Sequence, residues 1–516
     1  MVVKFTRETG GLQHAARRAA HTNSILRRLP CYLNFTPVLR KILPMPNLPK
    51  PKTTQNAAEE MVQNQQNPEL LLSGRLAAWF KVIAVAMITL VAFEVVAVST
   101  AMPYVVEALH GEQYYALVSG IGLAMQLTTT ALAGPWCDAK GPKAPLYIGL
   151  ALFICGLLVA TFAPSILVLV VGRAIQGIGG GLTLVPLYVM VGAHVKQSKQ
   201  PAFFAAFALA WVLPSFIGPL VAGIFVEHLH WRLVFGICPL LYAVLLPVAY
   251  SRFKHFPQIH VPRPLEIRRA LIVASLLAGA LVASLQIISG TDPADFNGIL
   301  IVTALLASAL LFAVVRVLVP KGTLLAARGV PATIALRGLI NGATIATEIY
   351  LVLLLKEVHG WEATQAGFVM TAGSATWALG SWVQGRISTP QFRAALAIVG
   401  PILQLIGTAA TMLALLPGIS GWVLLAGWLV AGFGTGALYP ATSVHALAVT
   451  PPEHHGEVSS GLQVADTLGG ALMMAYLGII YAISFALGTA AFAATISFSC
   501  IVIALCIWIG TRTEMR

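Results

Sequence analysis

The chain has 516 residues, of which 58% are hydrophobic and only 10% are charged, and its mean hydropathy is +0.82. Water-soluble globular domains carry about 25% charged residues, so this composition excludes that class. The net charge of +13 does not indicate nucleic-acid binding, because the lysines and arginines gather mainly in alternate loops between apolar runs.

The N-terminal part, residues 1–74, differs from the rest. It is basic, carries prolines between Pro44 and Pro51, and is then rich in Gln and Asn. It holds no apolar stretch long enough for the core of a signal peptide. We expect a disordered cytoplasmic tail that anionic lipid attracts. Two alternatives stay open: an Arg-rich organellar transit peptide, or a true start at Met45 or Met61.

Apolar runs near the length that crosses about 30 Å of hydrocarbon follow one another from there to the C-terminus. They predict fourteen spans, near 79–102, 113–133, 145–163, 166–192, 201–226, 232–250, 270–289, 298–319, 333–355, 363–383, 392–416, 421–448, 459–484 and 488–510. The predicted fold class is therefore an all-α polytopic membrane protein. Basic residues mark alternate loops, which places both termini in the cytoplasm.

A glycine pattern in span 4 recurs in span 12. The pattern Gly-x₄-Gly-x-Gly-x-Gly starts at Gly172 and again at Gly427. Its later glycines, which let neighbouring helices approach closely, are Gly177, Gly179 and Gly181 in the first copy and Gly432, Gly434 and Gly436 in the second.

This repeat predicts two related six-helix bundles, 75–250 and 331–511. Between them lies a connector with two inserted helices, 251–330, and residues 512–516 form a short cytoplasmic tail. Two related bundles around a site at the membrane midplane are typical of secondary transporters.

Three ionisable side chains lie at similar expected depth inside the apolar runs. At 1.5 Å per residue, Glu94 in span 1 and Glu348 in span 9 lie ~12 Å from the outer ends, and Arg173 in span 4 lies ~10 Å deep. A charge in hydrocarbon is costly unless it is paired or faces water. We expect Glu94 and Arg173 to pair and, with Glu348, to couple transport to protons. The alternative is a static ion pair that joins spans 1 and 4.

Two further charges lie nearer the predicted cytoplasmic ends. Asp466 in span 13 is expected to meet water from the cytoplasm. Arg337 in span 9 is expected to extend its side chain to the inner surface.

The connection between spans 2 and 3 predicts a tight cytoplasmic reversal, because glycines and prolines crowd between Gly134 and Lys143. Asp138 is a candidate latch beside Gly141, and the alternative is an ordinary short loop. In span 5, the sequence from Pro214 through Gly218, Pro219 and Gly223 predicts a hinge, although kinked membrane helices are common. These candidates are Gly134, Asp138, Gly141 and Lys143 for the gating loop, and Pro214, Gly218, Pro219 and Gly223 for the hinge.

A substrate cavity is expected between spans 1, 4, 9 and 12. Its candidate lining residues are Met102, Gln176, Asn341, Tyr350 and Tyr439. The alternative for these isolated polar or aromatic residues is that they hold helices together.

These stretches resemble motifs of the major facilitator superfamily, and in particular of its fourteen-span drug:proton antiporter branch. The resemblance covers about residues 75 to 510. The matching segments are Phe93 to Pro103, Gly134 to Lys143, Gly172 to Gly177, Gly218 to Gly223 and His230 to Phe235. The resemblance implies that Asp138 gates, that Glu94 and Arg173 couple to protons, and that Pro219 is a hinge.

The chain departs from the branch at three positions. Glu94 stands where aspartate is usual, Ala139 replaces the arginine after the loop aspartate, and Pro214 replaces a glycine of the antiporter motif. The last two departures leave the gating latch and the direction of transport open.

We expect a proton-coupled exporter of amphipathic small molecules that works by alternating access, as a monomer in the plasma membrane, of the bacterial inner-membrane kind. No P-loop occurs in the sequence, so ATP is not the expected energy source. We expect no metal, no cofactor, no nucleic-acid partner and no enzymatic activity. The alternatives are a narrow-substrate uptake or efflux carrier, and a membrane-embedded sensor that signals through its basic tail.

Overall fold

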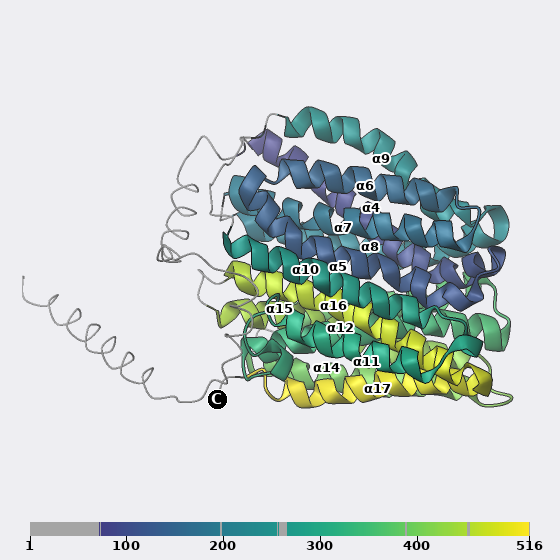
Figure 1. Ribbon diagram of the computed structural model, residues 1–516. Coiled ribbons are helices and arrows are strands. Elements are labelled where there is room, and N and C mark those ends of the chain that lie inside the picture. Colours follow the sequence, from purple (N-terminus) through teal and green to yellow (C-terminus); the bar gives the residue numbers. More distant parts are fainter. Residues whose placement is uncertain are drawn as a thin grey trace, which may run out of the picture. The chain divides into compact units, whose positions relative to one another are not determined.

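The computed structural model describes residues 72, 74–196, 199–254, 256, 266–386, 390–450 and 455–514, all within the unit 57–516. The predicted N-terminal tail lies almost entirely outside the described residues. Within them, fourteen long α-helices run side by side (Figure 1). They are α4 (Gly74–Ala108), α5 (Tyr115–Lys140), α6 (Lys143–Thr161), α7 (Ile166–His194), α8 (Gln200–Ile224), α9 (Arg232–Phe253), α10 (Glu266–Ser289), α11 (Gly298–Val315), α12 (Val330–His359), α13 (Ala363–Arg386), α14 (Pro390–Thr411), α15 (Trp422–Ala448), α16 (His455–Ser484) and α17 (Thr489–Gly510).

Each predicted span corresponds to one of these helices, so the all-α polytopic fold is confirmed. Thirteen of the described helices are long and apolar enough to cross a membrane. The exception among the fourteen is α13, which carries many Gly, Ser, Thr and Gln residues. With these spans the chain is a multi-pass membrane protein. Its spans are helical because a backbone buried in lipid must satisfy its hydrogen bonds within each helix.

The tight reversal predicted from Gly134 to Lys143 is wrong in extent. Helix α5 continues through Pro135 to Lys140, and only Gly141 and Pro142 separate it from α6. The chain turns at Gly141, whose φ of 76° and ψ of 164° are accessible essentially to glycine alone. The prolines and glycines of this stretch therefore do not all mark a loop, since a membrane helix tolerates them.

The helices form two sets with the same order of packing. In the first set α7 packs on α5 and α6, while α4 packs on α8. In the second set α15 packs on α13 and α14, while α12 packs on α16. The remaining helices, α9 and α17, contact the third helix of their own set. This shared order supports the predicted bundles 75–250 and 331–511, which we propose as the two halves of the molecule.

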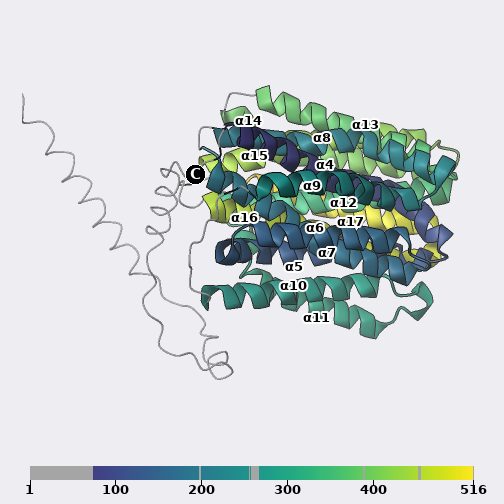
Figure 2. The same ribbon diagram turned by 90° about the horizontal axis from the view of Figure 1, so that it is seen from above.

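Two seams join the halves. Helix α5 of the first half packs on α16 of the second, and α8 of the first packs on α13 of the second. The inserted helix α10 contacts both α5 and α16, whereas α11 packs on α10 (Figure 2). At the centre of the molecule α4 meets α12.

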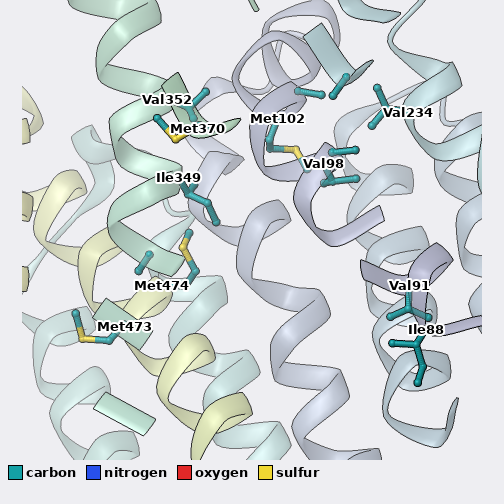
Figure 3. Close-up of a cluster of buried hydrophobic side chains, with 14 of the residues drawn as sticks. Ile88, Val91, Val98, Met102, Val234, Ile349, Val352, Met370, Met473 and Met474 are labelled. Carbon is teal, nitrogen blue, oxygen red and sulfur yellow. The ribbon is translucent and has the colours of Figure 1, made fainter. Parts of the chain in front are cut away.

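Apolar side chains fill the space where the halves meet. Met102 of α4, Ile349 and Val352 of α12, and Met370 of α13 belong to one cluster of buried residues (Figure 3). Two of these four side chains are methionines, which fill irregular gaps because they are unbranched and flexible.

Candidate functional site

The first buried ion pair lies in the first half, between α4 and α7. Glu94 is 1% exposed and Arg173 is 8% exposed, and Nη1 of Arg173 donates to Oε1 of Glu94. The same Nη1 lies 2.5 Å from Oε1 of Gln176, and Nε donates over 3.5 Å to the carbonyl oxygen of Val118. The structure therefore brings together the two residues that the sequence predicts as a pair, and it adds Gln176 as a partner of the arginine.

A second buried ion pair lies in the second half, between α12 and α16. Nε of Arg337 is 3.0 Å from both carboxylate oxygens of Asp466, and Nη2 donates to Oδ2 over 2.8 Å. The hydroxyl of Tyr439 also donates to Oδ2, over 2.6 Å, and Nη1 of Arg337 donates to the hydroxyl of Ser443. The guanidinium lies 4.0 Å from the centre of the Tyr439 ring. Such bidentate, charge-assisted contacts are among the strongest in proteins.

The expectations for Arg337 and Asp466 taken singly are wrong. Both side chains are buried, and each is the other's partner rather than a neighbour of water or of the membrane surface. The signal that points to the pair is the one used for Glu94 and Arg173, namely opposite charges inside two spans. The internal repeat gives a second signal. Arg337 and Asp466 lie in the first and fifth spans of one six-helix unit, and the first and fifth helices pack together in both halves.

Glu348 does not join the first ion pair. It lies on α12, and its described hydrogen bond is the one that Oε1 accepts from the hydroxyl of Ser99 on α4, over 3.5 Å. The bond crosses from one half to the other at the centre of the molecule. Glu348 is thus a partly buried carboxylate that, among the described residues, forms no ion pair.

The repeated glycines set the close packing inside each half. A Cβ at Gly177 would lie 2.1 Å from the carbonyl oxygen of Gly122 on α5, and one at Gly179 would lie 2.2 Å from the backbone nitrogen of Phe153 on α6. The second half repeats this arrangement. There a Cβ at Gly432 or Gly436 would lie 2.4 or 2.0 Å from a carbonyl oxygen of α13, and one at Gly434 would lie 2.6 Å from a carbonyl oxygen of α14. A Cβ at Gly181 would likewise lie 2.7 Å from the carbonyl oxygen of Gln126 on α5.

The gating-loop candidates do not form one cluster of described contacts. Gly134 lies within α5, where a Cβ would meet no atom within 4 Å. Lys143 begins α6, and its Nζ donates to the carbonyl oxygen of Phe256 over 2.7 Å. The side chain of Asp138 lies outside the described residues, so its role as a latch stays a prediction.

The span-5 candidates lie along α8, which continues through Pro214 and Pro219 as a helix. Gly218 meets Val96 of α4 at an ordinary packing distance of 3.4 Å for an added Cβ. Gly223 contacts the first turn of α13, where a Cβ would lie 2.6 Å from the Cα of Thr364. Gly218 therefore lies at a contact with α4 and Gly223 at a contact with the other half, while hinge motion stays a prediction.

The candidate cavity residues divide between polar clusters and the apolar interior. Gln176 contacts the arginine of the first ion pair, and Tyr439 contacts the aspartate of the second. Nδ2 of Asn341 donates to the backbone oxygen of Asp466 over 3.2 Å. Met102 is buried in the apolar interior, and Tyr350 packs edge-on against Tyr115 across the halves. That these residues line a substrate cavity stays a prediction.

Comparison with known proteins points to one family of transporters. The profile of the Major Facilitator Superfamily matches residues 84–422. A probable multidrug-efflux transporter of Mycobacterium tuberculosis is 24% identical over an alignment of 398 residues that covers 73% of this chain and 82% of that protein. Multidrug resistance protein 3 of Bacillus subtilis is 24% identical over an alignment of 394 residues that covers 74% of this chain and 75% of that protein.

The fold also matches solved structures. A crystal structure of a POT family transporter in complex with 5-aminolevulinic acid has a TM-score of 0.63 and 14% sequence identity, over 88% of this chain and 100% of that one. At this identity the likeness concerns the fold alone.

Proposed function

Since the chain belongs to the major facilitator superfamily and is a secondary transporter, we propose that it exports amphipathic small molecules in exchange for protons. The observation that carries the proposal is the buried pair of Glu94 and Arg173, which joins α4 to α7 in the first half. Buried carboxylates in membrane spans can bind and release protons, and such residues often mark proton pathways in transporters.

The proposed cycle begins with protonation of Glu94. The neutral carboxyl group loses its charge attraction to Arg173, which keeps its contacts with Gln176 and with the Val118 carbonyl. Helix α4 is then held less firmly to α7, and the equilibrium between the inward-facing and outward-facing states of the carrier shifts. Substrate binding in the state favoured by the unprotonated carrier promotes release of the proton. Glu348, across the central contact from Ser99, is the second proposed proton acceptor.

The direction and breadth of transport rest on the relatives. Two relatives at 24% identity are multidrug proteins by name, which supports export of varied small molecules. We also propose that the protein works as a monomer in a plasma membrane of the bacterial inner-membrane kind, where a proton gradient can drive export. Both termini are proposed to lie in the cytoplasm, following the charges of the loops.

Substrate retention in cells tests the proposal. We expect cells that produce the protein to retain less of a fluorescent amphipathic compound than cells that produce Glu94→Gln. Collapsing the proton gradient with a protonophore should raise retention in the first cells to the level of the second. Retention that is unchanged by the protonophore would overturn proton-driven export.

A narrow-substrate carrier is the second candidate. Pro214 and Ala139 stand where the drug-exporting branch usually has glycine and arginine, which favours a specialised carrier. Competition distinguishes the two functions, because a multidrug exporter should be inhibited by chemically unrelated compounds. A carrier with one substrate should be inhibited only by that substrate's close analogues.

A further inference from the structure

Polar contacts join the two halves at the end of the bundle where α4 ends and α5 begins, opposite the marked C-terminus in Figure 1. The hydroxyl of Tyr104 donates to the carbonyl oxygen of Trp361 over 2.9 Å. Nζ of Lys356 lies 2.9 Å from Oε2 of Glu107 and donates to the carbonyl oxygen of Pro103 over 3.2 Å.

A further contact joins Glu227 to the first turn of α13. One carboxylate oxygen of Glu227 accepts a hydrogen bond from the backbone nitrogen of Thr364, and the other accepts from its hydroxyl over 2.7 Å. Thr364 is the second residue of α13, so its N–H is one of those that lack a partner within the helix. A carboxylate is favoured there by the helix dipole as well. Glu227 therefore caps a helix that belongs to the other half of the carrier.

Local structure explains why the carboxylate reaches this position. Residues Phe225–Leu229 form a π-helical turn at the end of α8, and such turns redirect a side chain and are frequent at functional sites. The backbones also approach closely: a Cβ at Gly223 would lie 2.6 Å from the Cα of Thr364, and one at Gly367 would lie 2.5 Å from the carbonyl oxygen of Pro219. The first turn of α13 is thus held directly beside Glu227.

The neighbouring ion pair is the weaker contact. The Glu107 side chain is 61% exposed, and Lys356 also pairs with Glu357 over 3.1 Å. Exposed pairs with an alternative partner contribute little. Glu227 is partly buried and makes two hydrogen bonds to one residue, so it is the strongest of the charged contacts across this end.

We propose that Glu227 is a latch that closes this end of the carrier by capping α13 across the α8–α13 seam. With the cap in place, α8 and α13 stay in contact. When the cap is broken, the two helices separate more readily and this end opens. The latch sets the equilibrium between the open and closed states of this end, whatever the substrate or the driving ion. The latch therefore goes beyond the proposed function.

The distance between the halves at this end tests the latch. Spin labels at His230→Cys and Ser420→Cys, both exposed positions on different halves, report that distance in the purified full chain with its native cysteines replaced by serine. We expect Glu227→Ala to raise the ratio of the long-distance to the short-distance population about five-fold, the factor that loss of one helix cap typically brings.

Two further variants complete the test. Thr364→Val removes the hydroxyl donor but keeps the backbone N–H, so it should shift the same ratio in the same direction by less. Glu362→Ala removes an exposed carboxylate two residues from Thr364 and should leave the distances unchanged. If Glu227→Ala and Thr364→Val both keep the wild-type distances, or if Glu362→Ala shifts them as much, the latch is overturned. These distances are measured without transport, so their failure would not bear on proton-driven export.

Discussion

The two buried ion pairs differ in how firmly each carboxylate is held. In the first half a single carboxylate oxygen of Glu94 accepts from Arg173, whose Nη1 is shared with Gln176. In the second half both oxygens of Asp466 contact Arg337, and Tyr439 donates to one of them as well. The repeat thus gives both halves the same packing but different polar interiors.

This difference predicts different roles for the two pairs. Protonating Glu94 removes the charge from one hydrogen bond between α4 and α7, whereas protonating Asp466 would disturb contacts to Arg337 and Tyr439 at once. Networks in which each polar group has a partner make a structure rigid. We infer that the first pair switches and that the second pair fixes α12, α15 and α16 to one another.

The largest expected effect comes from removing the carboxylate of the second pair. Asp466→Asn leaves the Arg337 charge buried without its counter-ion, which should cost about 3–5 kcal/mol of unfolding free energy. Denaturant unfolding in detergent measures the loss. Glu94→Gln is the matched change in the first pair and alters one charged hydrogen bond only, so it should lose clearly less, and equal losses would contradict the difference in roles.

Removing one bond from the second pair should have a smaller effect. Tyr439→Phe deletes the donor to Asp466 but keeps the ring beside the Arg337 guanidinium. A hydrogen bond to a charged group contributes about 1.5–3 kcal/mol, and the same unfolding experiment should report a loss of that size. An unchanged stability would show that the second pair does not depend on its network.

The shared scaffold should respond alike in the two halves. Gly177→Ala and Gly432→Ala each force a methyl group against a facing backbone carbonyl, at 2.1 and 2.4 Å. Overpacking of this kind costs about 1–3 kcal/mol, and the two variants should lose similar amounts of unfolding free energy. A large loss in one variant and none in the other would mean that the repeat does not extend to helix packing.

The sequence predicts the helices well because each span carries its own signal. Length and hydropathy locate the helices, although α13 carries only a weak hydropathy signal, and the glycine repeat locates the contacts of α7 and α15. The end of α5 is predicted less well, since Gly134 and Pro135 are typical of loops in water but continue a helix here. In a membrane helix, neighbouring helices can satisfy the backbone groups that a proline or glycine leaves without a partner, and the local sequence does not show this.

The sequence predicts an ion pair of the site only where two opposite charges lie at a similar expected depth in the membrane. Glu94 and Arg173 share an expected depth and pair as expected. Arg337 and Asp466 lie 129 residues apart, and each alone has an ordinary explanation near a span end. The cap of α13 by Glu227 could not be foreseen, because it depends on a π-helical turn and on the approach of two helices from different halves.

Proton movement driven by substrate in proteoliposomes tests the central claim most directly. The wild-type protein and Ser443→Ala, which removes a contact of Arg337 in the second pair, should both move protons when substrate is added on one side. Glu94→Gln should bind substrate but lose most of the proton movement, because its amide cannot take up a proton and only the second proposed acceptor, Glu348, remains. Wild-type proton movement by Glu94→Gln would contradict the account and leave the first ion pair as a static contact between α4 and α7.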